Sequence, residues 1–309
     1  MDAPEARIKQ KAFELGFQSC GISRAQRHDL AGQRLQQWLD EGMNGPMNYM
    51  AANVEKRIDP RLLTPATQSI ISVSMNYFTQ ERQTDPRSPT VAKYAYGDDY
   101  HLIIRERLYA LLQFIQTEIA PCEGRAFTDS APIMEKVWAA NAGLGWLGKN
   151  TCLISHRYGS FFFIGELFVS LSLRPDEPVK ARCGACRRCI DACPTGALVA
   201  PYILDARRCI ACQTIELRDA PDATLLPRFG NRIFGCDRCQ NVCPWNSRAV
   251  PHNEPALRPN RRMLALLPDE WHNMTEETFA DIFRYSAIRR MGFNRMKLLL
   301  KELGNHAEL

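Results

Sequence analysis

The chain has 309 residues, a length that suggests about two domains, and its 45% hydrophobic content is ordinary for a globular protein. Residues up to 175 carry 19 basic and 18 acidic side chains, whereas the remainder carries 20 and 16, so the second part suits an acidic partner such as nucleic acid. No apolar run approaches the roughly 20 residues of a membrane span, and the charged segment 1–7 argues against a secretory signal. We therefore expect a cytoplasmic protein that does not enter membranes and keeps its thiols reduced.

The first 175 residues mix helical and strand patterns. Apolar periodicity predicts helices at 4–15, 30–39 and 101–119, and strands at 19–22, 68–78 and 124–128. The expected core stripe of the third helix consists of Leu102, Leu108, Leu111, Leu112 and Ile115. Ser130 is the expected N-cap of a helix from Ala131 to about Gly143, and the apolar runs 151–156 and 160–171 around Tyr158 and Gly159 predict a hairpin.

The rest of the chain changes character twice. Residues 176–250 are rich in Cys and Pro and leave room for little regular structure. From Pro251 the pattern becomes helical: Thr275 is an expected N-cap, with Phe279, Ile282 and Phe283 facing inward, and a last helix at 289–303 should stop at Gly304. The expected divisions are therefore 1–175, 176–250 and 251–309.

Two cysteine runs point to iron-sulfur chemistry. The first has CxxCxxCxxxCP spacing and consists of Cys183, Cys186, Cys189 and Cys193. The second consists of Cys236, Cys239 and Cys243 before Pro244. In two-cluster ferredoxins the fourth cysteine of a run binds the other cluster, so the first cluster is predicted to use Cys183, Cys186, Cys189 and Cys243. The second is predicted to use Cys193, Cys236, Cys239 and one more thiol, either Cys209 or Cys212, which lie between the runs.

Other interpretations of these cysteines and two neighbouring motifs fit less well. Structural zinc needs four ligands per site, and the cubane spacing with two Cys-Pro steps argues against it. The remaining Cys20, Cys122 and Cys152 are interpreted as small buried apolar residues. Residues 143–150 resemble phosphate-binding loops, but a helix precedes them and strand-like sequence follows, the reverse of what such loops require. His101 follows Asp99 as in a DxHxxG corrinoid motif, but Ile104 replaces the glycine, so His101 is interpreted as an ordinary first-turn residue.

A long domain ahead of the clusters indicates a catalytic module supplied with electrons. Several short motifs occur in a fixed order along the chain: Gly45-x-Met47-x-Tyr49, Lys56-Arg57, Tyr96 to His101, Asp129 to Pro132, Gly143 to Asn150, Cys209-Ile210, and Gly230 to Pro244. In this order they resemble the epoxyqueuosine reductase family. The resemblance implies a cobalamin-dependent enzyme with two 4Fe-4S clusters that reduces epoxyqueuosine at the tRNA wobble position to queuosine.

The family resemblance also implies a fold and partners. The fold would be α+β: a nitroreductase-like corrinoid-binding domain (1–175), a ferredoxin-like two-cluster domain (176–250) and a short helical C-terminal segment (251–309) that lacks the HEAT-like repeat of many members. Cys209 is the eighth thiolate that the family pattern supports. The implied partners are tRNA carrying epoxyqueuosine and a low-potential electron donor such as ferredoxin or flavodoxin, and we expect a monomer.

The family pattern assigns Asp129 as the proton donor. The implied cofactor contacts are Arg57, Tyr94, Asp99, Asp129, Gly148, Asn150 and Leu153. We expect enclosure to raise the pKa of Asp129 by desolvation, against the effect of the helix N-terminus expected just after it. Basic residues that we expect to meet tRNA phosphates are Arg228, Arg232, Arg238, Arg289, Arg290 and Arg295.

Three other functions are compatible with parts of the pattern. A corrinoid reductase of a small organohalide would usually carry a twin-arginine leader, which we do not expect here. A ferredoxin-type electron-transfer protein would hold iron and sulfide but no corrinoid. A zinc-bearing RNA-binding scaffold would hold zinc and be colourless.

Overall fold

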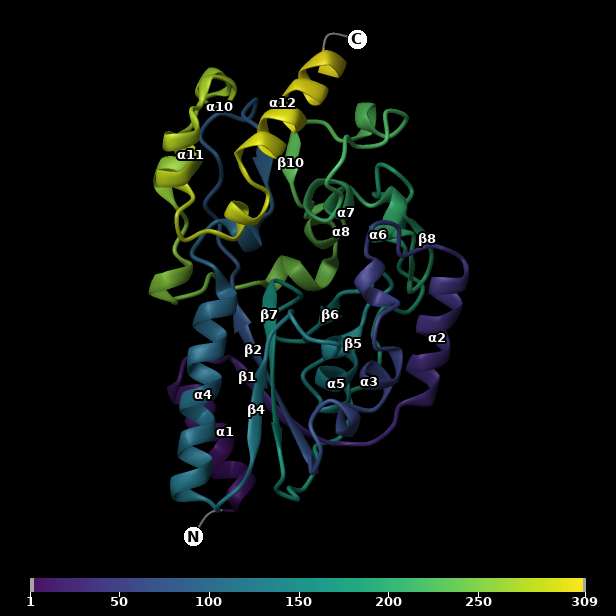
Figure 1. Ribbon diagram of the computed structural model, residues 1–309, viewed down its shortest axis with the longest axis vertical. Helices are drawn as coiled ribbons and strands as arrows, with labels where there is room; N and C mark the ends of the chain where they lie inside the picture. The colour runs from purple at the N-terminus through teal and green to yellow at the C-terminus, as the bar shows by residue number, and fades with distance from the viewer. Residues whose placement is uncertain (1–2, 308–309) are drawn as a thin grey trace.

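The computed structural model describes residues 3–307 and is built around a four-stranded antiparallel sheet (Figure 1). The strand order is β1-β2-β7-β4, with β1 at Ser19–Arg24, β2 at Ser69–Asn76, β4 at Gly124–Phe127 and β7 at Phe162–Val169. The two central strands are buried along almost their whole length. Both faces of the sheet are covered, so even the polar residues of these strands, Ser72 and Ser74 of β2 and Glu166 of β7, are buried.

Helices lie on both sides of this sheet. Those of the front domain are α1 (Pro4–Glu14), α2 (Asp29–Asp40), α3 (Val54–Ile58), α4 (Tyr100–Glu118) and α5 (Glu135–Asn141). In Figure 1, α1 and α4 cover one face, while α5 lies against the other with α3 and α2 beyond it. The predicted helices and strands of this domain are confirmed to within a few residues, except the helix after Asp129 and the hairpin around Tyr158.

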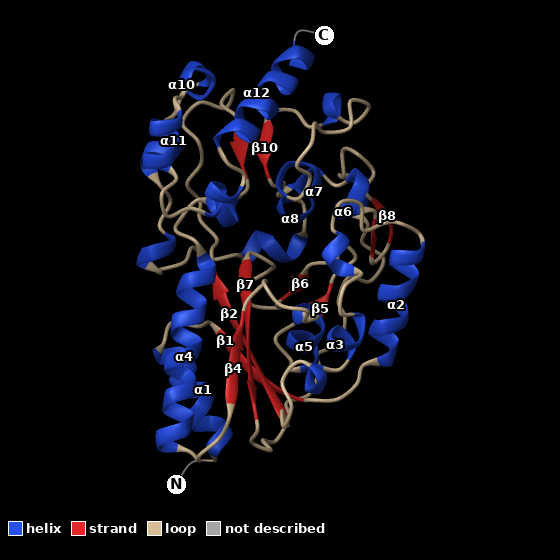
Figure 2. Cartoon of the chain, in the orientation of Figure 1, coloured by secondary structure: helices blue, strands red, loops and turns tan. Residues whose placement is uncertain are grey.

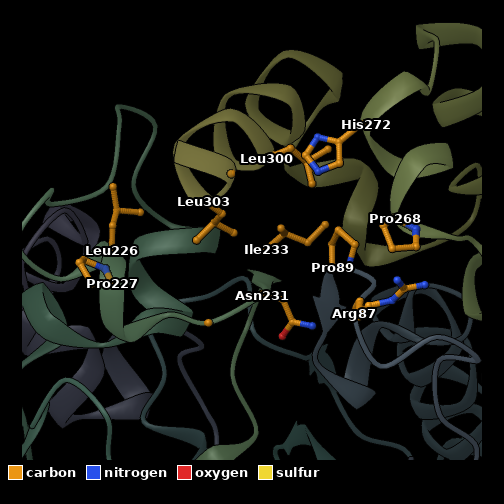
Figure 3. Close-up of a pocket in the computed structure, with 12 residues that line it drawn as sticks. Arg87, Pro89, Leu226, Pro227, Asn231, Ile233, Pro268, His272, Leu300 and Leu303 are labelled. Carbon is orange, nitrogen blue, oxygen red and sulfur yellow. The ribbon is translucent and has the colours of Figure 1, made fainter. Parts of the chain in front are cut away.

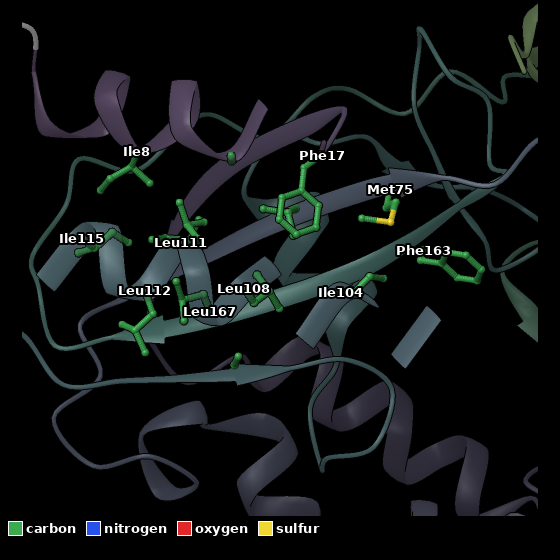
Figure 4. Close-up of a cluster of buried hydrophobic side chains, with 14 of the residues drawn as sticks. Ile8, Phe17, Met75, Ile104, Leu108, Leu111, Leu112, Ile115, Phe163 and Leu167 are labelled. Carbon is green, nitrogen blue, oxygen red and sulfur yellow. The ribbon is translucent and has the colours of Figure 1, made fainter. Parts of the chain in front are cut away.

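The main hydrophobic core lies between α1, α4 and the sheet (Figure 4). Ile104, Leu108 and Ile115 of α4 are fully buried there, together with Ile8 of α1. Leu102 was expected in this stripe, but its side chain is 67% exposed. The prediction for Leu102 was wrong, because in this turn of the helix Ile104 faces the sheet.

The predicted hairpin around Tyr158 and Gly159 is also wrong. Only a local bridge between Ser155 and Gly159 forms there. Strand β6 (Leu153–Ile154) pairs instead with β5 (Trp146–Leu147), and β7 enters the middle of the large sheet between β2 and β4. The apolar run therefore belongs to a central strand, and pairing partners far away in sequence decide its place.

Residues 176–250 contain short elements separated by loops (Figure 2). The elements are α6 (Arg188–Asp191), β8 (Leu198–Ala200), β9 (Ile203–Leu204), α7 (Ile210–Ile215), β10 (Arg232–Phe234) and α8 (Arg238–Asn241). This region is joined to the front domain, since β10 pairs in parallel with β3 (Thr90–Val91). The prediction of little regular structure here is confirmed.

The chain after Pro251 is helical and packs where β10 pairs with β3, at the junction of the front domain and residues 176–250. Its helices are α9 (Arg261–Ala265), α10 (Pro268–Asn273), α11 (Glu276–Ile282) and α12 (Phe293–Ala307). Thr275 caps α11 as predicted, accepting from the Thr278 N–H at 3.2 Å. The last helix starts later than expected and continues past Gly304, so the predicted stop is wrong. Among the helices of residues 3–307, none has the length and apolar character needed to cross a membrane.

Candidate active site and iron-sulfur region

The two cysteine runs form a pair of similar turns. In each run a four-residue helix, α6 or α8, carries the middle of the run, and the two helices contact each other. The Cys193 N–H donates to the Ile190 carbonyl at 3.2 Å, and the Cys243 N–H donates to the Gln240 carbonyl at 3.1 Å. This repeated geometry brings cysteines from both runs together, which the predicted crossed ligation requires.

One group of thiols combines Cys183, Cys189 and Cys243. Burial raises the pKa of Cys189, and the neighbouring Cys243 and Cys183 raise it further. Burial likewise raises the pKa of Cys243, with Cys183 adding to the effect. Thiols raise one another's pKa only when they lie close together, so the last cysteine of the second run sits with the first run.

A second group combines Cys193, Cys209, Cys236 and Cys239. Burial raises the pKa of Cys209, and Cys236 and Cys193 add to it. The pKa of Cys239 is raised by a hydrogen bond with Cys152, by burial, and by Cys209 and Cys236. All twelve cysteines are free thiols, so both groups have the donor chemistry that iron-sulfur clusters need.

Cys212, the other candidate for the eighth thiolate, is placed differently. It is buried on α7, and the groups that raise its pKa after burial are Cys209, Glu216 and Asp205. No cysteine of either run contributes to this shift in the pKa of Cys212. Cys209 is thus the thiol between the runs that faces the second group.

Cys152 does not behave as an isolated apolar residue. Its thiol hydrogen-bonds Cys239, and this contact lowers the pKa of Cys152 to about 7 although burial opposes the shift. Lys149, three residues earlier, donates from Nζ to the carbonyls of Gly184 and Cys186 at 2.6 and 3.0 Å. The loop at 148–153 of the front domain therefore contacts both cysteine runs.

A separate set of functional side chains surrounds Asp129. Strand β4 runs back along α4, so the residue that follows β4 lies beside the first turn of α4. Tyr100 donates its hydroxyl hydrogen to Asp129 Oδ2 at 2.9 Å, and His101 Nε2 lies 3.2 Å from the same oxygen. His101 Nδ1 lies 2.6 Å from Oδ1 of Asp99, which also caps α4 by accepting the His101 N–H at 3.0 Å. His101 thus bridges two carboxylates.

The charge balance of this network reverses one expectation. Burial disfavours the charged form of His101, but hydrogen bonds to Asp129 and Asp99 outweigh it and raise the pKa of His101 to about 9. The hydrogen bond from His101 lowers the pKa of Asp129, against burial and with help from Tyr100. We expected burial to raise the pKa of Asp129, and this was wrong for the described chain. At neutral pH the proton of the pair sits on His101.

The helix after Asp129 also differs from the prediction. Helix α5 begins at Glu135, so Ser130 is not its N-cap. Asp129 itself has a φ of +56°, an uncommon backbone conformation for a residue with a side chain. Its N–H donates to Glu135 Oε1 at 2.6 Å. The Asp129 N–H is therefore bound by a side-chain carboxylate, and no helix begins directly after Asp129.

Aromatic rings pack against the side chains that surround Asp129. The ring of Tyr100 stacks on Phe163 of β7, with centroids 4.0 Å apart, and on His101 at 4.1 Å. Tyr94 packs edge-on against Tyr100 and, with its ring tilted, against Phe234 of β10. Tyr94 therefore connects the Asp129 network with the cysteine-rich region through ring packing.

The remaining predicted cofactor contacts lie on two other segments. Arg57 is buried on α3 and donates to the carbonyls of Tyr49 and Ala52 at 2.7 and 3.3 Å. Among residues 3–307 no carboxylate forms an ion pair with it, and burial lowers its pKa. Asn150 Nδ2 is buried without a hydrogen-bond partner in the described chain. A buried guanidinium without a counter-ion and an unpaired amide donor fit a ligand with phosphate and amide oxygens, as a corrinoid has.

Gly148 and Leu153 complete this segment. A Cβ at Gly148 would lie 2.4 Å from Ile154 Cδ1 and 2.7 Å from Asn150 Oδ1, so a larger residue would require these side chains to shift. Leu153 is buried in a small core with Leu144 and Phe162. These two residues shape the loop; neither brings a polar group to the Asp129 network.

The basic residues divide into two classes. Arg289 and Arg290 are exposed on a short 3-10 turn, and Arg290 helps to lower the pKa of Asp129, so this turn lies near the network. Arg228 and Arg238 are exposed elsewhere. Arg295 is buried and donates to the carbonyls of Gln213 and Asp219. The prediction that Arg295 meets a phosphate was wrong, because its guanidinium holds the chain at 213–219.

A cavity of about 220 Å³ lies away from these sites (Figure 3). It is lined by residues of α12, of the segment 226–233 and of the loop around Arg87. None of the predicted site residues lines it, so it does not mark the active site.

Sequence patterns did not single out Tyr100 or Glu135. His101 was interpreted as an ordinary first-turn residue, and this was wrong, because its ring bridges Asp99 and Asp129. Tyr100 and His101 stood inside the family motif at 96–101, and the pairing of Asp99 with His101 was the available signal. No spacing rule links them to Asp129, since the contact depends on how β4 returns along α4. Glu135 had no signal, because a helix was expected to begin before it.

Comparisons with known proteins agree with this geometry. The family model described as epoxyqueuosine reductase QueG, DUF1730, matches residues 57–130, and that of a 4Fe-4S double cluster binding domain matches 182–246. Epoxyqueuosine reductase of Cellulophaga algicola is 46% identical over 290 residues, which cover 94% of this chain and 94% of that protein.

Solved structures of that family superpose on the chain. Epoxyqueuosine reductase with an epoxyqueuosine-modified tRNA-Tyr stem loop has a TM-score of 0.90 at 27% identity, over 97% of this chain and 80% of that chain. The Bacillus subtilis enzyme, with its catalytic aspartate loop swung out of the active site, has a TM-score of 0.89 at 26% identity, over 97% and 81%. Given the sequence identity over nearly its whole length and the double-cluster domain at 182–246, the chain belongs to the epoxyqueuosine reductase family of oxidoreductases.

Proposed function

We propose that this chain reduces the epoxide of epoxyqueuosine in tRNA to give queuosine, with cobalamin and two 4Fe-4S clusters as cofactors. The observation that carries the proposal is the convergence of Tyr100 and His101 on Asp129, with Asp99 bound to the other nitrogen of His101. Removing an epoxide oxygen as water consumes two protons and two electrons. A poised proton source beside an electron-transfer domain is the combination that this reaction needs.

Asp129 and His101 would act together as the acid. His101 carries a proton at neutral pH, and its Nε2 lies 3.2 Å from Asp129 Oδ2. As negative charge develops on the epoxide oxygen, the proton held by His101 would pass to Asp129 Oδ2 and from there to that oxygen. Tyr100 orients the carboxylate by donating to the same oxygen, and Asp99 holds the imidazole in place. Asp129 is half exposed, so a substrate can reach it.

Residues 1–175 would form the nitroreductase-like corrinoid-binding domain. The sheet with helices on both faces supports this assignment. Arg57 and Asn150 would bind polar groups of cobalamin, with Tyr94, Asp99 and Asp129 on the reacting side and Gly148 and Leu153 shaping the loop. Bound cobalamin would supply a cobalt centre able to attack or reduce the epoxide carbon.

Residues 176–250 would conduct the electrons, and 251–309 would complete the junction. We assign Cys183, Cys186, Cys189 and Cys243 to the first cluster and Cys193, Cys209, Cys236 and Cys239 to the second. The contact between Cys239 and Cys152 supports the second cluster as the one nearer to the front domain. A ferredoxin or flavodoxin would reduce the first cluster. The chain would act as a monomer in the cytoplasm.

The tRNA would lie over the turn that carries Arg289 and Arg290. Both are exposed, and Arg290 already acts electrostatically on Asp129. Removing one arginine that binds a phosphate should reduce the salt dependence of tRNA binding by roughly one unit of slope. Replacing both arginines by glutamine should therefore flatten that dependence, whereas replacing the buried Arg295 should act on stability.

Nucleoside mass spectrometry of tRNA tests the proposed activity. Cells that lack this protein should accumulate epoxyqueuosine, and reintroducing the chain should restore queuosine. Queuosine at wild-type levels in the deletion strain would contradict the proposal. An iron-containing protein that takes up no corrinoid under anaerobic conditions would leave only electron transfer.

A further inference from the structure

The loop that carries Asp129 is held at its backbone by one partly buried carboxylate, that of Glu135. Glu135 Oε1 accepts the Asp129 N–H at 2.6 Å, whereas Tyr100 and His101 hold only the Asp129 side chain. The Ser130 N–H donates to the Thr128 carbonyl at 2.7 Å, which closes a tight turn around Asp129. The backbone of Asp129 has a positive φ, which costs conformational energy unless its surroundings hold it.

We propose that Glu135 is a positioning residue: its ionised carboxylate fixes the Asp129 peptide, and its protonation loosens the active-site loop. A hydrogen bond to an ionised acceptor is roughly twice as strong as one to a neutral acceptor. The inference rests on the proposed function only in giving the loop a catalytic task, since the contact itself is independent of the substrate.

The surroundings of Glu135 place this change near neutral pH. Burial raises the pKa of Glu135 to about 7, and the charge of Asp129 adds to the effect. The Asp129 N–H, Lys136 and His101 oppose it. Glu135 therefore loses its charge as the pH falls through about 7, and the loop should be firmly held only above that pH.

The strands beneath α5 contribute few other ionisable groups. Strand β2 has none, while β1 carries Cys20 and Arg24. Strand β7 carries Glu166, which is fully buried, accepts the Ser72 hydroxyl at 2.6 Å and has its pKa raised well above the ordinary value, chiefly by burial. The charge of Glu135 adds to this shift, so Glu166 lies near Glu135, but its carboxyl is bound by Ser72 and not by the Asp129 loop.

Hydrogen-deuterium exchange of the purified full chain tests the inference without any turnover. In the wild type, protection of the Asp129 amide, corrected for intrinsic exchange, should fall about fivefold as the pH drops from 8.5 to 5.5, with a midpoint near 7. Glu135→Gln should show the lower protection at every pH. Glu166→Gln, a buried carboxyl on β7 that does not touch the loop, should match the wild type.

The same three proteins give a second measurement. The turnover number of the wild type should decline below pH 7, and in Glu135→Gln this decline should be absent while KM for the tRNA stays unchanged. Wild-type protection in Glu135→Gln, or no pH dependence in the wild type, would overturn the inference. If Glu135→Gln fails to fold, the wild-type exchange profile alone decides. Loss of turnover in all three proteins with the expected exchange pattern would count against the proposed reaction only.

Discussion

The front domain and the cysteine-rich region are stabilised in different ways. The front domain buries β2 and β7 between two layers of helices, and its core side chains on α4 are fully enclosed. In residues 176–250, α6 and α8 have four residues each and no buried side chain. The front domain is stabilised mainly by apolar burial. Residues 176–250 have only a small core around Phe229, so metal binding by their thiols should supply part of their folding free energy.

The largest effect should follow from removing a cluster ligand. Cys209→Ala should lose about half of the iron and all turnover, because Cys209 sits with Cys193 and Cys236. Iron and sulfide assays measure the loss, and limited proteolysis should then cut within 176–250 before it cuts the front domain. Cys212→Ala is the matched control and should keep its iron. The reverse result for the two variants would reassign the eighth ligand.

A second variant should reduce turnover without changing the stability of either region. Asp129→Asn keeps the size of the side chain but cannot serve as an acid, so turnover should fall about a hundredfold or more. Iron content and melting temperature should change little, because the side chain is half exposed. Asp98→Asn, a neighbouring carboxylate outside the network, serves as control. Retained turnover in Asp129→Asn would remove Asp129 from the mechanism.

The core of the front domain can be tested with two leucines of one helix. Leu108→Ala should lower the free energy of unfolding by about 2–5 kcal/mol, because Leu108 is fully buried. Leu102→Ala, on the exposed side of α4, should change it by less than about 0.5 kcal/mol. Urea unfolding of the iron-loaded proteins measures both. Equal losses would mean that burial on α4 does not control the stability of this domain.

The smallest effect concerns pH and His101. Its folded pKa of about 9 lies above the ordinary 6.5, so its ionic contacts stabilise the fold fully below pH 6.5 and lose this contribution as the pH rises through 9. His101→Gln should therefore cost about 1 kcal/mol at pH 6 and little at pH 10. Thermal unfolding across this range is the measurement, with His156→Gln as control. A constant difference between wild type and His101→Gln would mean that the imidazole is not charged in the folded state.

Local sequence patterns predicted where the helices and strands lie better than they predicted which strands pair. The helix at 101–119 and the strand at 68–78 were evident from their apolar residues, and α4 and β2 match them closely. The hairpin at Tyr158 failed because the pairing of β7 with β2 and β4 depends on strands distant in sequence. Leu102 and Gly304 were misplaced since burial by neighbouring helices overrides local propensity.

The sequence by itself indicated iron-sulfur binding, because the two-residue gaps place several cysteines in one short turn. Which cysteines of the two runs lie together depends on the contact between α6 and α8. The sequence also determined the family, through short motifs in a set order. The tertiary structure alone decided that His101 holds the proton and that Glu135 receives the Asp129 peptide. Those contacts form only after β4 has folded back along α4, and charges respond to distance in space and not to distance along the chain.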